Sequence, residues 1–73
     1  MLLSDVNKSI FLGKTVVLLD DVLTNNKKIL AGSFCKVLKC SALYAELEYE
    51  YKFFLVVPLR RIRLANFEDY MEL

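Results

Sequence analysis

Residues 43–50, LYAELEYE, carry the clearest pattern in the chain. Apolar and polar side chains alternate along them, with one face formed by Leu43, Ala45, Leu47 and Tyr49 and the other by Tyr44, Glu46, Glu48 and Glu50. Successive side chains of a strand point to opposite faces of its sheet, so a period of two indicates a strand buried on one side only. Half-buried strands of this kind are typical of antiparallel sheets. The stretch therefore predicts an antiparallel strand packed on a core.

The chain on either side of this stretch has the same texture. Runs of β-branched and apolar residues predict further strands at residues 14–20, 33–40, 52–57 and 59–64. Pro58 cannot donate to a sheet, so it predicts a break between the last two of them. Residues 21–30 predict a hairpin-like excursion turning at Asn25 and Asn26, which tolerate the left-handed backbone of a tight turn.

Short helical segments are expected at both ends. Near the N-terminus, Ser4 is the expected N-cap and Gly13 the expected stop of a helix carrying Val6, Ile10 and Phe11. Near the C-terminus, Asn66 is the expected N-cap, with acidic residues in the first turn where the helix dipole favours them. The apolar residues of this second helix form one stripe at helical spacing, consisting of Phe67, Tyr70 and Met71.

Five short strands in a single 73-residue domain favour a closed or nearly closed barrel, because a flat sheet of this size would leave one face and two edges uncovered. The layout resembles the SH3-like barrel over residues 13–64: a first strand, a long hairpin-like loop, Gly32 before the second strand, two meander strands, and Val57-Pro58-Leu59 as a one-turn link to the last strand. Residues 1–12 and 65–73 are the helical appendages. The predicted fold class is thus all-β, a small five-stranded SH3-like barrel with a short C-terminal helix.

That resemblance is closer to the small accessory-subunit or KOW-type barrels than to the signalling SH3 domains. The chain has no tryptophan, whereas the signalling domains use a tryptophan pair in their ligand groove. The resemblance therefore does not imply binding of proline-rich peptides. It implies an accessory or interaction module instead.

Composition excludes several classes of protein. Hydrophobic residues make up 56% of the chain and the mean hydropathy is +0.38, which excludes disorder. The formal net charge is only +1, so the chain has neither the strongly basic nor the strongly acidic balance of a protein that binds polyions. Neither a membrane-spanning run nor a signal peptide is visible, and a cytoplasmic location with no membrane partner is expected.

The chain has little chemistry to offer a catalyst. It has no histidine, hence no histidine base or nucleophilic dyad. Cys35 and Cys40, about 17 Å apart along one strand, are expected to be reduced and buried. Gly13-Lys14-Thr15 resembles the end of a P-loop, but Lys8 stands where the first glycine is required. We therefore expect a protein that is not an enzyme, with no catalytic residues, cofactor, metal site or small-molecule substrate.

Two charged groups remain as candidates. Glu46, Glu48 and Glu50 form a carboxylate row, which we interpret as a solvated face opposite lysines such as Lys36, Lys39 and Lys52. The arginines Arg60, Arg61 and Arg63, together with Tyr51 as a stacking platform, constitute a candidate nucleic-acid site of a KOW-type barrel. The sequence pI of 7.7 argues against that alternative, and the arginines are then expected to pair with the glutamates.

The surplus of apolar residues favours a different function. On the strands around residues 33–57, the side chains expected to point outwards include Phe34, Leu38, Tyr44, Phe54 and Val56. The terminal helices could cover this face; otherwise a protein partner or a second copy covers it. The leading hypothesis is a non-catalytic interaction module or small accessory subunit. Its contact surface is this face or the loop at residues 20–30, and the partner is another protein or, in a homo-oligomer, a second copy of the chain.

Overall fold

A computed structural model describes residues 2–24 and 26–71 of the chain, except for the side chain of Ser4. In chain order its elements are α1 (Leu3–Phe11), β1 (Thr15–Leu18), β2 (Val22–Thr24), β3 (Lys27–Ile29), β4 (Phe34–Cys40), β5 (Tyr44–Tyr49), β6 (Phe53–Pro58), the one-turn 3-10 helix η1 (Leu59–Arg61), β7 (Ile62–Leu64) and α2 (Phe67–Met71). The expected mostly-β fold with a short helix at each end is confirmed.

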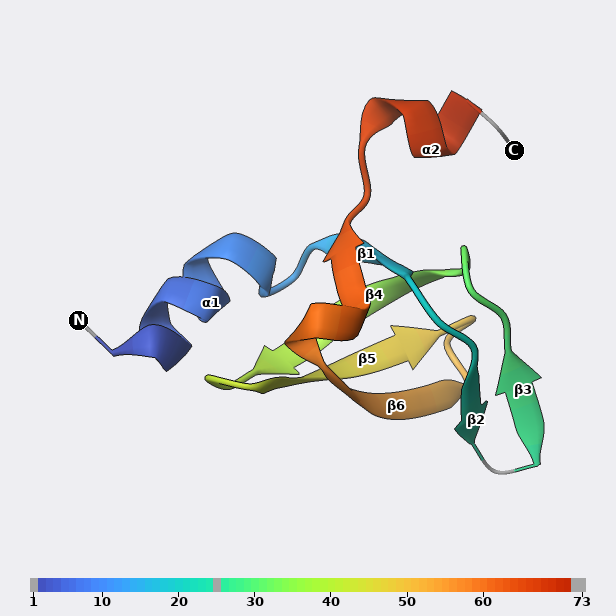
Figure 1. Cartoon of the computed structure of the whole chain (residues 1–73), viewed down its shortest axis with the longest axis horizontal. Coiled ribbons are helices and arrows are strands. Elements are labelled where there is room, and N and C mark those ends of the chain that lie inside the picture. Colours follow the sequence, from blue (N-terminus) through green and yellow to red (C-terminus); the bar gives the residue numbers. More distant parts are fainter. Residues whose placement is uncertain (1, 25, 72–73) are drawn as a thin grey trace.

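Five of the strands form one antiparallel sheet in the order β6-β5-β4-β1-β7, and β2 pairs with β3 in a separate hairpin (Figure 1). The hairpin occupies the expected excursion, and Asn26 in its turn has the left-handed φ of +65° that was predicted. Asn25 lies outside the described residues. The last predicted strand is only half right, because residues 59–61 form η1 and only Ile62–Leu64 pair with β1.

The alternation predicted for residues 43–50 is confirmed in β5. Ala45 and Leu47 are buried, while Tyr44 and Glu46 are exposed. Leu43 was expected on the buried face, but it precedes the strand and is 68% exposed. The turn before β5 explains the difference, since the backbone at Ser41 bonds to Tyr44 and leaves Leu43 at its tip.

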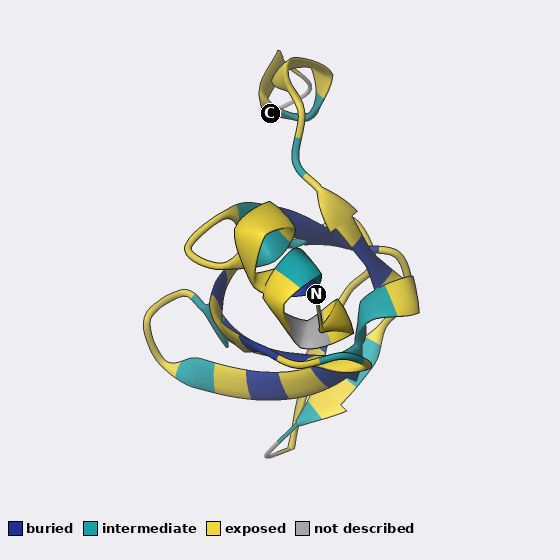
Figure 2. Cartoon of the chain, turned by 90° about the vertical axis from the view of Figure 1, so that its left-hand side faces the viewer, coloured by how far each residue is buried: buried dark blue, intermediate teal, exposed yellow. Residues whose placement is uncertain are grey.

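The apolar core lies inside the curl of the large sheet. Figure 2 shows buried positions alternating with exposed ones as the strands curve round. The buried cluster consists of Val16, Leu18, Ile29, Cys35, Val37, Cys40, Ala45, Leu47, Leu55, Val57 and Ile62. The two cysteines are free and buried as expected, and burial raises the pKa of the Cys35 thiol to about 11.

Helix α1 lies across one open end of this curl, as Figure 2 shows. Its fixed point is Asn7, which is only 9% exposed and donates two 3.0 Å hydrogen bonds from its amide nitrogen to the carbonyls of Ser41 and Ala42. The helix begins at Leu3 with Leu2 in the cap position, so the prediction of Ser4 as N-cap is wrong. Gly13, with φ +74°, follows the last turn as predicted.

Helix α2 stands away from the sheet beyond β7 (Figure 1). Its start is capped reciprocally: Asn66 Oδ1 accepts from the Asp69 N–H at 3.1 Å, and Asp69 Oδ2 accepts from the Asn66 N–H at 2.7 Å. The predicted N-cap is therefore confirmed. The apolar stripe is not buried, however, because Phe67 and Met71 are 76% and 70% exposed.

Candidate interaction surface

The outer face of strands β4, β5 and β6 carries an ordered set of exposed side chains. The registers place Lys36 opposite Glu48 and Glu48 opposite Phe54; in the next row Lys39 faces Glu46, which faces Val56. The outer face is therefore basic along β4, acidic along β5 and apolar along β6. Its apolar members are Leu38, Tyr44, Phe54 and Val56.

These four residues are among the five expected on an outward apolar face, and the structure places them there. Their side chains are 37%, 51%, 61% and 67% exposed in chain order. Phe34, the fifth, is partly buried. The ring of Tyr70 in α2 stacks on the Phe34 ring, with the two ring centroids 5.1 Å apart. Among the described residues, α2 thus shields one end of the face and leaves β6 open.

A β-bulge on β4 shapes this face. The register shifts between Val37 and Lys39, so that Leu38 and Lys39 both lie on the exposed side while Cys40 returns to the core. A bulge inserts one extra residue against a regular partner strand, which explains the mixed polarity of β4. The sequence carries no signal that distinguishes this bulge from ordinary alternation.

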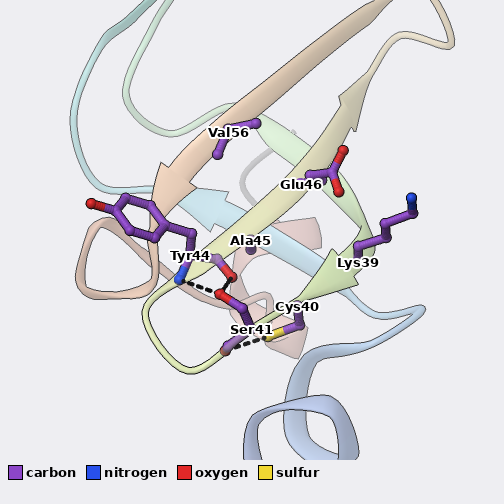
Figure 3. A pocket seen from close by; sticks show the side chains of 7 residues that line it. All are labelled: Lys39, Cys40, Ser41, Tyr44, Ala45, Glu46 and Val56. Atoms are coloured by element: carbon purple, nitrogen blue, oxygen red, sulfur yellow. Dashed lines mark hydrogen bonds between the residues drawn. The ribbon is translucent and has the colours of Figure 1, made fainter. Parts of the chain in front are cut away.

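Tyr44 separates two shallow hollows. One, of about 280 Å³, lies between Tyr44, Val56, Glu46 and Lys39 (Figure 3). The other, of about 220 Å³, is lined by Ala42, Leu43, Tyr44, Pro58, Leu59 and Arg60. Ser41 fixes the backbone at Tyr44. Its hydroxyl accepts a hydrogen bond from the Tyr44 N–H at 3.1 Å, and its own N–H donates to the Tyr44 carbonyl at 2.8 Å.

The carboxylate row is shorter than expected. Glu46 and Glu48 lie on β5 opposite lysines, as interpreted from the sequence, but Glu50 lies in the turn after the strand and Lys52 lies in the same turn. Within residues 2–24 and 26–71, no ion pair joins these glutamates to a lysine.

Two of the three arginines, Arg61 and Arg63, pair with aspartates instead. Arg61 reaches Asp20 at 3.7 Å, and Arg63 makes a two-pronged contact of 2.7 and 2.8 Å with Asp69. That contact, together with the Asn66 N–H, lowers the pKa of Asp69 to about 2. The expectation that these arginines pair with the glutamate row is therefore wrong.

The structure separates two of the candidate nucleic-acid residues, Arg60 and Tyr51. Arg60 follows the C-terminal end of β6, whereas Tyr51 lies in the turn that precedes its N-terminal end. A strand of this length separates its ends by about 17 Å. Tyr51 and Arg60 therefore cannot belong to one compact stacking site.

In the part of the chain that the structure describes, no group of three Cys, Asp or Glu side chains is placed to hold a metal ion. No described helix is long and apolar enough to cross a membrane. Comparisons with protein-family models, with curated proteins and with solved structures returned no significant match to the chain.

Proposed function

We propose that the chain is a non-catalytic protein-binding module whose contact surface is the outer face of β4, β5 and β6. The observation that carries the proposal is the exposure of Phe54 and Val56 at successive outward positions of β6, with the exposed Tyr44 lining a hollow beside Val56, on a domain of 73 residues. Contiguous apolar surface that is not covered internally is typical of interaction sites. Neither terminal helix covers this surface among the described residues: α2 covers Phe34, and α1 lies across one open end of the curled sheet.

The proposed framework of this module is an SH3-like barrel. Three features support it: the strand order β6-β5-β4-β1-β7, the hairpin β2–β3 inserted between β1 and β4, and the single turn η1 before the last strand. The curl of the sheet (Figure 2) and the contact of β2 with β6 support closure at the hairpin end. Such a frame presents strand faces rather than a deep pocket.

The charge pattern favours a protein over a nucleic acid as partner. Lysines and glutamates occupy adjacent rows of the face, which suits a partner of mixed charge. Two of the three candidate arginines are engaged by Asp20 and Asp69. Phosphate contacts supply most of the non-specific affinity for nucleic acid, and the two arginine–aspartate ion pairs would compete with such contacts.

The cytoplasmic location of the module remains a prediction.

Site-specific photo-crosslinking tests this proposal. Full-length chain carrying benzoylphenylalanine in place of Phe54 is irradiated in a nuclease-treated lysate of the source organism, and the same label at Leu23, 78% exposed on β2, is the control. We expect a protein adduct of discrete mass from position 54 only. Excess unlabelled wild-type chain should abolish it, and excess chain carrying Val56→Lys should not.

Three results would count against the proposal. An adduct from position 23 alone would place the contact on the β2–β3 hairpin. An adduct that forms in a parallel untreated lysate and is lost on nuclease treatment would favour the nucleic-acid alternative. Absence of any protein adduct from position 54, in the lysate and with the purified chain, would remove the outer face from consideration.

A further inference from the structure

The outer side of the sheet carries a second row of side chains, which crosses strands β4, β1 and β7. Val17 pairs with Phe34 on one side and with Arg63 on the other. Cys35 and Ile62, the strand neighbours of Phe34 and Arg63, belong to the core cluster, as do both neighbours of Val17. Side chains alternate along a strand, so all three residues point outwards. They form what we term the Phe34–Arg63 row.

Helix α2 reaches both ends of this row with two consecutive side chains. The Tyr70 ring stacks on the Phe34 ring with the planes within 9° of parallel. The Asp69 carboxylate accepts two hydrogen bonds from the Arg63 guanidinium, at 2.7 and 2.8 Å. Val17 is only 4% exposed although it lies outside the core cluster. It is thus buried between the two residues that α2 contacts.

The attachment of α2 is confined to one side of the helix. The Asp69 side chain is 13% exposed, whereas Phe67 and Met71 point to solvent. None of the five residues of α2 is buried, and a helix of this length is not stable by itself. Undocking would therefore break the stack and the ion pair without disturbing the core cluster. Contacts of these two kinds together favour a docked state about tenfold.

The Phe34–Arg63 row is continuous with the proposed contact surface. Phe34 also lines a hollow of about 240 Å³. The other residues that line it are Thr15, Cys35, Lys36, Glu48, Glu50 and Tyr51. Lys36 and Glu48 lie in one register row with Phe54 of β6. Strands β4 and β6 are about 10 Å apart, and a protein interface covers about 800 Å² on each partner. One partner therefore has room to contact Phe54 and the Phe34–Arg63 row together.

We propose that the protein partner of the outer face displaces α2 from the Phe34–Arg63 row and replaces it with a segment in which an aromatic residue follows a carboxylate. This inference rests on the proposed function and names the chemistry that the surface recognises. The chemistry is that of α2 itself. The planar guanidinium of Arg63 binds a carboxylate through two parallel hydrogen bonds, and Phe34 offers a ring face to a second ring. Helix α2 is then an internal competitor, which weakens the apparent affinity for the partner by the factor that favours docking.

NMR titration of the labelled full-length chain with a capped peptide of residues 65–71, ANFEDYM, tests the proposal. The acceptor is Tyr70→Ala, whose own α2 has lost the stack, after circular dichroism has verified that it folds. We expect the Phe34 and Arg63 resonances to shift with a dissociation constant of about 1 mM, since a short linker gives α2 a millimolar effective concentration. Wild type and Tyr70→Phe, which retain the stack, should bind the peptide about three- to tenfold more weakly.

Variant peptides identify the groups that the row recognises. Tyr70→Ala or Asp69→Asn in the peptide should each weaken binding about three- to tenfold. Glu68→Gln in the peptide is the matched control, because Glu68 is exposed in α2, and it should bind as the unchanged peptide does. In the wild-type chain, excess peptide should also accelerate amide exchange at residues 67–71, since it takes the place of the helix.

The crosslinking assay connects the row to the partner. The Tyr70→Ala change should raise the yield of the position-54 adduct in the treated lysate about threefold at limiting chain concentration. Excess ANFEDYM peptide should lower that yield, and the Asp69→Asn peptide should do so less.

Each remaining outcome has a definite meaning. No binding of the peptide to Tyr70→Ala at ten times the expected dissociation constant, or equal affinity for Tyr70→Ala and wild type, would overturn the competition. Single-stranded RNA that accelerates exchange in α2 where the peptide does not would assign the row to nucleic acid instead. A position-54 adduct that neither the peptide nor Tyr70→Ala affects would sink this inference and leave the proposed function standing. Peptide exchange without any adduct would support the exchangeable helix and remove the proposed function.

Discussion

The ring of Tyr70 stacks on the ring of Phe34 with centroids 5.1 Å apart and planes within 9° of parallel. This contact joins α2 to the first residue of β4, and the Arg63–Asp69 pair joins the same helix to β7. A five-residue helix is too short to be stable by itself. The stack and the ion pair together therefore hold α2 in place.

Replacing Tyr70 with alanine should release α2 without unfolding the sheet. Aromatic pairs contribute about 0.5–1.5 kcal/mol beyond area burial, and this one is at the periphery. We expect faster amide exchange at residues 67–71 and a fall of no more than about 1 kcal/mol in the free energy of unfolding by urea. Tyr70→Phe preserves the stack and should behave as wild type. Unchanged exchange in the alanine variant would show that the stack does not hold the helix.

The attachment of α2 should depend on pH through Asp69. The bonds from Arg63, and then that from the Asn66 N–H, depress the pKa of Asp69 from 3.8 to about 2 in the folded chain. A depressed carboxylate pKa stabilises the fold above the unfolded-state value and ceases to do so as pH falls through the folded value. Order in α2, followed by the Tyr70 ring resonances in NMR spectra, should therefore persist above about pH 4 and decline towards pH 2. Asp69→Asn should remove this transition; a transition that survives in it would assign the effect to another group.

Asn7 should matter more for stability than its polar neighbour Lys8 in α1. Its amide serves two carbonyls in the turn before β5, and its removal leaves both without that donor. Loss of bonds to partly buried groups costs about 1–3 kcal/mol, which we expect for Asn7→Ala in urea unfolding. Lys8→Ala, at the exposed neighbouring position, should change stability by less than about 0.5 kcal/mol. Equal effects of the two variants would contradict the proposed anchoring of α1.

Two adjacent valines provide a test of the β6 register. Val56 is 67% exposed and Val57 is 3% exposed. Val56→Lys should leave the free energy of unfolding of the monomer within about 0.5 kcal/mol of wild type, because the change is on the surface. Val57→Lys buries an unpaired charge and should cost several kcal/mol or prevent folding. Similar stabilities for the two would show that the strand is placed one residue out of register.

Local patterns predicted most of the elements, and long-range contacts account for what was missed. The alternation in residues 43–50 and the helix signal at Asn66 depend on neighbours within a few residues; the first is confirmed within β5, though not at Leu43 and Glu50, and the second is confirmed. The pairing of Arg61 with Asp20 joins residues far apart in the chain, so it depends on the sheet order rather than on spacing. The bulge at Leu38 was missed because residues on both sides of it retain alternation. Cover by a terminal helix was one of the two alternatives that the sequence left open; that Tyr70 of α2 covers Phe34 depends on a contact between a helix and a strand far apart in the chain.

The turn between β5 and β6 is strained at Tyr51, and relieving the strain should stabilise the fold. Glu50 and Tyr51 have φ of +53° and +62°, the left-handed values of a tight hairpin turn, and Tyr51 is 88% exposed. This backbone conformation destabilises the fold by about 1–2 kcal/mol when an L-residue adopts it, and glycine avoids that strain. Part of the gain is lost again, because glycine has greater conformational freedom in the unfolded chain. We expect Tyr51→Gly to raise the free energy of unfolding in urea by about 0.5–1 kcal/mol. A loss of stability would show that the tyrosine ring makes contacts worth more than the strain. The same variant tests the nucleic-acid alternative. Labelled single-stranded RNA is titrated at two salt concentrations against the wild type and against Tyr51→Gly. We expect the two proteins to have the same affinity for RNA at each salt concentration, because Tyr51 is then not a stacking platform; a weaker affinity of the variant would support the alternative.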